Sequence, residues 1–553
     1  MNSIHGRTRW GRLAAIFGAA AISALQCLTL PAFAGFELPP GERITNLPAI
    51  PRQMPQKEAY ELYDPVIGRN FDIKNLWMRA DLRVRPEMRN NACFGMAQGG
   101  AGTCNSFGTR GANPTGGNKG NDMFVQQWMR LGIGYDLSPD VNFYVEIIDS
   151  AVWGGNGSAV NAGNGGDPLN HNGSIAANAG GGNGGRLGVR AAYMLIRNLA
   201  DVQGLSVKVG RQYVVFGNHS LFGHFDWANT GYSHDGVMFA YQTKNWDSYF
   251  GWFRNSESDL GQASPVGSGA PNIAGTGAQD AQRDADMFIF YNQIKMVPGM
   301  VIEPFYVLYQ NRYGSADNAA QGLGTAKHSN QTRHMIGNRV EVRKGGFDFS
   351  NEVAWQFGQM GQVGACAGEQ KCLHINAWAT RNWIGYTFYD TAWKTRLAFN
   401  LDYASGDSRN NTCTNGTNCK TANTFENFFP TNHIHMGYMD VQAWKNMLSP
   451  SVNLQARPSA RDHIELWYTN LNLANSKDCW YRGSQGCYVF SNANNTKTHI
   501  GDEIDVAYTR MFADGKVALQ AAYGTIFSGG YLTSTLNQTQ NQHWAYMSLW
   551  MNF

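Results

Sequence analysis

The strongest constraint on the fold is a set of eighteen segments in which apolar and polar residues alternate with a period of two. Such alternation puts apolar side chains on one face of a β-strand and polar side chains on the other. We expect strands near 75–88, 124–136, 140–150, 187–199, 204–213, 235–243, 247–255, 284–294, 300–310, 332–344, 347–358, 376–388, 394–404, 444–456, 462–471, 502–511, 516–525 and 543–553. An even number of amphipathic strands suits an antiparallel sheet that closes on itself.

The connections between these segments alternate between short turns and long loops. Short turns lie at 136–140, 243–247, 297–299, 344–346 and 513–515, and carry Gly, Pro, Asn, Asp or Ser. Long connections lie at 89–123, 151–186, 214–234, 255–283, 311–331, 359–375, 405–443, 472–501 and 526–542. Short periplasmic turns and long extracellular loops are typical of outer-membrane barrels, whereas soluble sandwiches lack this alternation. The sequence therefore predicts an all-β fold, a transmembrane antiparallel up-and-down β-barrel of about 18 strands over residues 71–553.

The N-terminal region predicts export. Arg7, Arg9 and Arg12 precede a mostly apolar stretch, and 32–34 read Ala-Phe-Ala, so residues 1–34 have the features of a secretory signal peptide. No later run of about 18 apolar residues occurs, so a membrane crossing requires a barrel. The Pro-rich segment 35–70 is expected to be either a periplasmic segment or a lumen plug.

The last predicted strand indicates both the membrane and an assembly partner. One parity carries Ala545, Met547, Leu549, Met551 and Phe553, and the other carries Trp544, Tyr546, Ser548 and Trp550. A strand that ends on Phe resembles the signal by which the barrel-assembly machinery recognises outer-membrane proteins. We expect this strand to close the barrel against segment 75–88, in outer-membrane lipid of a Gram-negative bacterium.

Charge excludes one class of partner and describes the predicted lumen. The predicted signal holds three arginines and no acid, so the rest of the chain has 41 basic and 41 acidic residues, which gives no support to nucleic-acid binding. Strand parity turns most charged side chains inward, because an arginine facing lipid at mid-bilayer costs about 2–4 kcal/mol. The predicted pore-lining residues are Arg79, Asp81, Arg83, Arg85, Glu87, Arg130, Arg190, Lys208, Arg339, Glu341, Arg343, Arg396, Asp402, Glu503 and Asp505. Either these ions pair and fill the lumen, or the arginines select anionic solutes.

The cysteines of the mature chain predict disulfides rather than a cofactor. All eight lie in long loops as close pairs, which in an oxidising compartment favours four local disulfides, Cys93–Cys104, Cys366–Cys372, Cys413–Cys419 and Cys479–Cys487. No C-x-x-C or C-x-x-C-H motif occurs, so we expect neither a metal site nor covalent haem, and no cofactor.

Several motifs resemble the alginate-export family of outer-membrane proteins. They lie at Val209–Gly217, Phe225–Gly231, Asp235–Val237, Ser405–Asp407, Phe425–Thr431, His433–Asp440 and Gly501–Asp505. The resemblance implies an eighteen-stranded porin-like barrel and, for the family's type members, polyuronate secretion through a strongly cationic lumen. The mixed charges expected here depart from that pattern. Residues that match the densest family motif are Arg211, Asp226, Trp227, Asn229 and Asp235.

These motif residues surround one extracellular loop that we expect to fold toward the pore. Arg211 has the lipid-facing parity of its strand, so it should lie beyond the membrane band and pair with Asp226 or Asp235. Anchoring of the loop is the favoured role, ahead of contact with a solute.

The sequence bears on three classes of function. A channel for passive passage of hydrophilic solutes, with anionic solutes, oligosaccharides or polyuronates as the preferred cargo, is favoured. The alternative is a structural or interaction barrel whose plugged lumen docks extracellular or periplasmic partners. No enzyme is expected: Ser405, His433, His435 and Asp440 supply hydrolytic residue types, but no G-x-S-x-G or H-E-x-x-H motif accompanies them. The two histidines should hydrogen-bond within their own loop.

Overall fold

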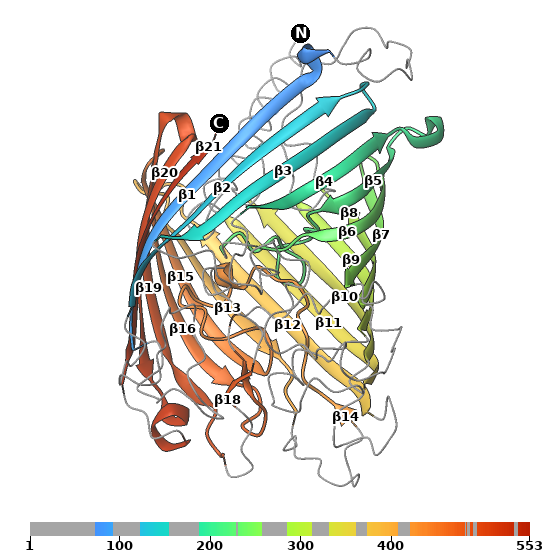
Figure 1. Ribbon diagram of the computed structural model, residues 1–553. Helices are drawn as coiled ribbons and strands as arrows, with labels where there is room; N and C mark the ends of the chain where they lie inside the picture. Colours follow the sequence, from blue (N-terminus) through green and yellow to red (C-terminus); the bar gives the residue numbers. More distant parts are fainter. Residues whose placement is uncertain are drawn as a thin grey trace, which may run out of the picture.

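The protein is a closed antiparallel β-barrel (Figure 1). The computed structural model describes residues 72–91, 122–153, 187–227, 231–256, 285–311, 331–360, 373–407, 421–481, 483, 487–489, 495–535 and 540–552. Its wall strands are β1 (Leu76–Asn90), β2 (Asp122–Asp136), β3 (Val141–Val152), β4 (Leu187–Arg197), β5 (Leu205–Gln212), β6 (His234–Gln242), β7 (Trp246–Ser256), β8 (Ala285–Ile294), β9 (Met300–Asn311), β10 (Gln331–Lys344), β11 (Phe347–Met360), β12 (Leu373–Thr387), β13 (Arg396–Ala404), β15 (Met447–Ser459), β16 (Asp462–Leu473), β19 (His499–Phe512), β20 (Val517–Ser528) and β21 (Gln542–Asn552).

Each wall strand pairs with the next, and the last pairs with the first. β21 lies antiparallel to β1, with Trp550 opposite Arg83 and Trp544 opposite Arg89, which closes the barrel. All eighteen predicted strands are confirmed. The strand expected at 444–456 begins at Met447, because residues 444–446 belong to a loop inside the barrel.

The loops and turns between the wall strands contain short strands and helical turns. β14 (Thr421–Ala422) adds to β12 in parallel, and β17 (Trp480–Tyr481) pairs with β18 (Cys487–Val489). Single helical turns are η1 (Ile73–Asn75), η3 (Leu199–Asp201), η6 (Asn432–Ile434), η7 (Ala513–Gly515) and η8 (Tyr531–Thr535). Among the described residues, no helix is both long and apolar enough to span a membrane.

Exposure follows the period-two pattern. On β21, Met547 and Leu549 are 49% and 44% exposed, whereas Ser548 and Trp550 are 0% and 1% exposed. The outer face is therefore apolar and the inner face holds the polar and aromatic side chains, as strand parity predicted.

Two loops fold into the barrel and fill part of its interior (Figure 1). Loop A joins β5 to β6, with described residues 213–227 and 231–233. Loop B, residues 423–446, joins β14 to β15. The loops pair with each other: Gly223 N donates to Phe429 O at 2.8 Å, and Phe429 N donates to Leu221 O at 3.0 Å.

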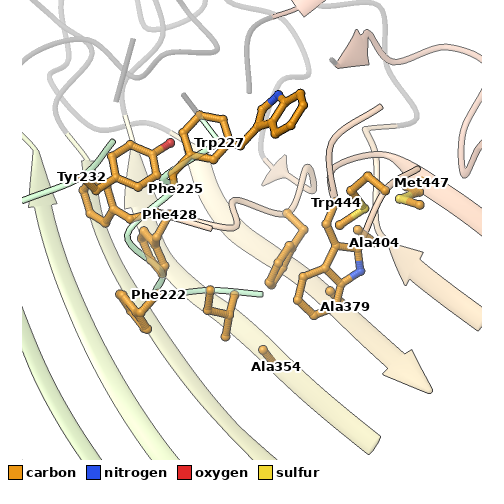
Figure 2. Packing of buried hydrophobic residues seen from close by; sticks show 14 of the residues in the cluster. Phe222, Phe225, Trp227, Tyr232, Ala354, Ala379, Ala404, Phe428, Trp444 and Met447 are labelled. Atoms are coloured by element: carbon orange, nitrogen blue, oxygen red, sulfur yellow. The ribbon is translucent and has the colours of Figure 1, made fainter. Parts of the chain in front are cut away.

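Aromatic side chains from both loops form the core, which lies inside the barrel. Figure 2 shows Phe222 of loop A beside Phe428 of loop B, and their rings stack at 6.0 Å between centroids. The same figure shows Trp444 close to the small side chains Ala379 and Ala404 on the inner wall.

Small residues on the inner wall make room for this core. Five alanines on the inner faces of β11, β12 and β13 are completely buried, and they are Ala354, Ala377, Ala379, Ala398 and Ala404. Gly337 on β10 makes room for a wall side chain instead, since a Cβ atom there would lie 2.3 Å from the ring of Phe305 on the neighbouring strand β9. Because protein interiors are close-packed, small wall residues opposite large loop residues fix where the loops sit.

Candidate functional site

The first sector of the inner wall is basic. On β1, β2, β4 and β5 seven cationic side chains are buried, namely Arg79, Arg83, Arg85, Arg89, Arg130, Arg190 and Lys208. Only three carboxylates described on β1–β5 are buried, and they are Asp81, Glu87 and Glu146. Inward parity on neighbouring strands brings these residues together on one part of the wall. The excess of positive charge makes this sector attractive to anions.

The basic sector binds the main chain of loop A. Arg83 Nη1 donates to the carbonyl oxygen of Asp226 at 2.6 Å, and Arg85 Nη1 donates to that of Trp227 at 2.9 Å. Arg85 also pairs with Glu87 at 2.7 Å, and its guanidinium lies 3.5 Å from the Trp227 ring centroid. Loop A is therefore held by guanidinium groups.

Asp226 forms the closest ion pairs between loop A and the wall. Its Oδ2 lies 2.6 Å from Arg130 Nη1, and its Oδ1 lies 2.9 Å from Arg190 Nη2. Burial alone would raise the pKa of Asp226, but the charges around it, Arg130 first, lower that pKa well below its ordinary value. Burial also lowers the pKa of the neighbouring His224 to about 4, so this histidine is neutral at pH 7.

The last sector of the wall is acidic and holds loop B. Glu465, Glu503 and Asp505 are buried on β16 and β19, and no arginine or lysine described on β15–β21 is buried. Met439 N donates to Glu503 at 3.0 Å, and Tyr438 N donates to Asp505 at 3.2 Å. Arginines thus donate hydrogen bonds to main-chain oxygen atoms of loop A, and carboxylates accept hydrogen bonds from main-chain N–H groups of loop B.

The remaining wall, from β7 to β13, carries paired charges. Arg339 pairs with Glu303 and Glu341, Arg396 pairs with Asp348, and Arg381 pairs with Asp402 at 2.9 Å. Arg343 lies at the short-turn end of β10 with 45% of its side chain exposed, so it borders the mouth. Lys208, in the basic sector, lies over the ring of Tyr193 at 3.8 Å.

The two loops meet at Trp227 and His433. Their rings stack at 3.6 Å between centroids with an interplanar angle of 6°. His433 Nδ1 lies 3.0 Å from Asp440 Oδ2, within loop B as predicted, and burial lowers the pKa of His433. The prediction for His435 was wrong: its Nε2 lies 2.6 Å from the carbonyl oxygen of Asn218 in loop A, because the loops pair with each other inside the barrel.

Ser405, His433 and His435 make separate hydrogen bonds. Ser405 Oγ donates to the main-chain oxygen of Asn423 at 2.7 Å, whereas His433 hydrogen-bonds to Asp440 and His435 hydrogen-bonds to the main-chain oxygen of Asn218. Over the described ranges, no group of three or more His, Cys, Asp or Glu side chains is placed to hold a metal ion.

The family-motif residues separate into two places. Arg211 Nη1 lies 2.9 Å from Asp235 Oδ2 on the outer face, at the long-loop ends of β5 and β6. Asp226 and Trp227 lie inside the barrel, and Asn229 falls outside the described residues.

Only one predicted cysteine pair touches the described region. Cys479 is disulfide-bonded, and the β17–β18 ladder places the backbone of Cys487 opposite Tyr481. Cys93, Cys104, Cys366, Cys372, Cys413 and Cys419 lie outside the described residues, as do segments 1–34 and 35–70.

Several inner residues were missed from the sequence. Arg89 and Arg333 share inward parity with predicted residues of their own strands, so strand parity could have found them, whereas Arg381 lies on β12, where no pore-lining residue was predicted. The density of aromatic residues in segments 213–233 and 423–446 was the signal for loops that pack inside.

Comparison with known proteins identifies one family and several similar structures. Residues 139–546 match the alginate-export family. The structure is similar to a BenF-like porin from Pseudomonas fluorescens Pf-5 (12% identity, 87% of this chain and 99% of that chain, TM-score 0.48). It is also similar to OpdK of Pseudomonas aeruginosa, solved with vanillate (8% identity, 86% and 98% coverage, TM-score 0.47). No curated protein sequence matches significantly. The barrel, its apolar outer face and the match over most of the chain show that this protein belongs to the alginate-export family of the Gram-negative outer membrane.

Proposed function

We propose that the protein is an outer-membrane channel for passive passage of hydrophilic solutes, and that it prefers anionic solutes such as carboxylates and polyuronates. The observation that carries this preference is the basic sector, with seven buried cations against three wall carboxylates. Rings and rows of arginine select anions in other pores. The acidic sector on β16 and β19 adds hydrogen-bonding carboxyl groups on another part of the wall, which would orient a solute that carries both charge and hydroxyl groups.

The pore-lining role is proposed for the whole predicted set, with Arg83 and Arg85 as its centre. Both are completely buried, and both bind main-chain oxygens of loop A. A solute that displaced these oxygens would present its own oxygen atoms to the same guanidinium groups. No covalent chemistry is required for passage.

A planar-bilayer experiment tests the proposal. In a KCl gradient the wild-type protein should conduct with a reversal potential on the anion side, and the variant R83Q/R85Q should shift that potential toward cations. Arg510→Gln is the matched control, because Arg510 has outward parity near the short-turn end of β19 and lies outside the lumen. A double variant that keeps the wild-type reversal potential would refute the anion preference.

A second candidate function is a structural barrel whose plugged lumen docks other proteins. The observation in its favour is the packing of loops A and B against the inner wall, which buries Trp227, Trp444 and their neighbours completely. Absence of conductance in the full chain and in a variant lacking residues 35–70 would favour this function over the channel.

Three further proposals concern biogenesis. Residues 1–34 would be removed as a signal peptide, the barrel-assembly machinery would recognise the strand that ends on Phe553, and the four cysteine pairs would form disulfides in the periplasm or outside the cell. Mass spectrometry of the mature protein under non-reducing conditions tests the first and third. A Phe553→Ala variant that assembles as well as the wild type would contradict the second.

A further inference from the structure

We propose that Arg130 and Arg190 form a carboxylate-binding site, and that Asp226 occupies it as a tethered ligand which the carboxylate of a solute displaces. This inference rests on the proposed channel function and names the regulation of the same site. Arg130 comes from β2, Arg190 from β4, and Asp226 from loop A.

The geometry of the Asp226 carboxylate is that of a bound ligand. Each oxygen faces a different guanidinium, with Oδ2 at 2.6 Å from Arg130 and Oδ1 at 2.9 Å from Arg190. Two charge-assisted hydrogen bonds from two guanidinium groups are the usual way in which proteins recognise a carboxylate. A free carboxylate of similar size would make the same two contacts.

The two arginines are also positioned by groups other than Asp226. Arg130 lies 3.4 Å from Asp81 and its guanidinium is 4.3 Å from the Trp128 ring centroid. Arg190 Nη1 donates at 2.8 Å to Oγ of Ser233, the last residue of loop A before β6, and this hydroxyl donates to the main-chain oxygen of Arg190. These contacts keep both guanidinium groups in place when the Asp226 side chain leaves, so the site is preorganised for a second ligand.

Exchange of ligands follows from the energetics of buried charge. Both arginines have side chains only 3% exposed, and removal of one partner from a buried ion pair costs about 3–5 kcal/mol because a charge is left uncompensated. The part of loop A that carries Asp226 therefore leaves the arginines readily only when another anion replaces Asp226. A neutral solute offers no such compensation, so the site couples the movement of loop A to the charge of the solute.

The test is the sign of a change in affinity. Gluconate is titrated calorimetrically into the purified full-length protein in detergent, with sorbitol as the uncharged match. When a tethered competitor occupies a site, the apparent Kd of an external ligand equals its intrinsic Kd divided by the fraction of molecules whose site is free. Asp226→Asn should therefore bind gluconate at least about tenfold more tightly than the wild type does. Neither protein should bind sorbitol. Equal or weaker gluconate binding by Asp226→Asn would overturn the proposal.

Two control variants separate displacement from simple electrostatics. Glu146→Gln removes one negative charge near Arg130, from which Glu146 lies 3.9 Å, but Glu146 belongs to the wall rather than to loop A. It should change gluconate affinity less than Asp226→Asn, and an equal gain would refute displacement. Adding Arg190→Gln to Asp226→Asn should abolish the gain, and a retained gain would place the site elsewhere. Asp226→Ser serves as a second loop variant if the asparagine variant does not fold.

Failure of this inference is distinguishable from failure of the channel. If the wild type conducts with anion preference but Asp226→Asn shows no gain in affinity, only the tethered-ligand proposal is refuted. If no variant conducts, whereas gluconate still binds Asp226→Asn more tightly, the carboxylate site stands and the channel function does not.

Discussion

Trp227 and His433 stack face to face at 3.6 Å, and this contact joins the two loops that fill the barrel. On its other side Trp227 meets the guanidinium of Arg85 at 3.5 Å. Wall, loop A and loop B therefore meet at one indole ring. Basic wall residues hold loop A, and acidic wall residues hold loop B. We therefore expect the two loops to separate first at this ring.

Replacing Trp227 with alanine should loosen loop A without disrupting the barrel. Loss of a buried tryptophan from a packed core costs about 3–5 kcal/mol, and here the loss falls on the loop contacts. We expect larger or more frequent open states in single-channel recordings. Trp252→Ala is the matched control, since Trp252 lies on the outer face of β7 with 38% exposure. Identical recordings for Trp227→Ala and the wild type would show that loop A does not limit conduction.

The wall of the barrel could be predicted from the sequence because its physics is local. The two faces of each strand can be recognised within that strand alone. In 543–553, for example, the apolar Met547 is 49% exposed, whereas its polar neighbour Ser548 is 0% exposed. Neighbouring strands follow in order, and antiparallel pairing of consecutive strands leaves little choice of topology. The pairing of β1 with β21 followed from closure alone.

The interior could not be predicted because it depends on contacts without local pattern. Asp226 contacts Arg130 and Arg190, which lie 96 and 36 residues away from it in the sequence. Loop B meets loop A across more than 200 residues, as in the bond from Phe225 N to Thr431 Oγ1. Strand parity gives the side of the wall on which an arginine lies, but the loop group that it meets depends on how the loops pack against small wall residues such as Ala354.

Enlarging an inner-wall alanine should displace the loops. Ala354 is completely buried in the core of loop aromatics (Figure 2), so Ala354→Leu overpacks this site and should destabilise the closed arrangement by about 1–3 kcal/mol. Limited proteolysis should cut loop A or loop B faster than in the wild type. The control is Val353→Leu, one residue away on the outer face with 42% exposure. Equal cleavage rates for the two variants would contradict the packing argument.

Placing a charge on the outer face should destabilise the barrel in lipid. Met547→Arg puts a guanidinium in the apolar band of β21 and should lower the free energy of unfolding in vesicles by about 2–4 kcal/mol if the residue lies near mid-bilayer. Met547→Leu, which nearly conserves volume, should cost less than about 1.5 kcal/mol. Reversible unfolding in urea measures both. A negligible effect of arginine would mean that this side chain does not face hydrocarbon.

A pH-dependent contact lies at Asp478, which joins two long loops. Its Oδ2 accepts hydrogen bonds from Asp407 N at 2.7 Å and Thr424 Oγ1 at 2.6 Å, and its Oδ1 accepts one from Cys479 N at 2.7 Å. Burial, assisted by the nearby Asp407 carboxylate, raises the pKa of Asp478 to about 7, against an ordinary value of 3.8. The packed loops therefore favour the protonated form.

The stability of this loop contact should fall as pH rises from about 4 to about 7. Below that window the carboxyl group is protonated in both the packed and the open state, and above it the group is ionised in both, so the contribution is constant outside the window. Within it the packed state binds more protons than the open state and loses stability as protons are removed. Amide-exchange protection of Asp407, corrected for intrinsic exchange rates, should decrease over this range in the wild type. It should be independent of pH in Asp478→Asn, and a wild-type protection factor that rises with pH would show that the hydrogen bonds to the ionised carboxylate outweigh its burial.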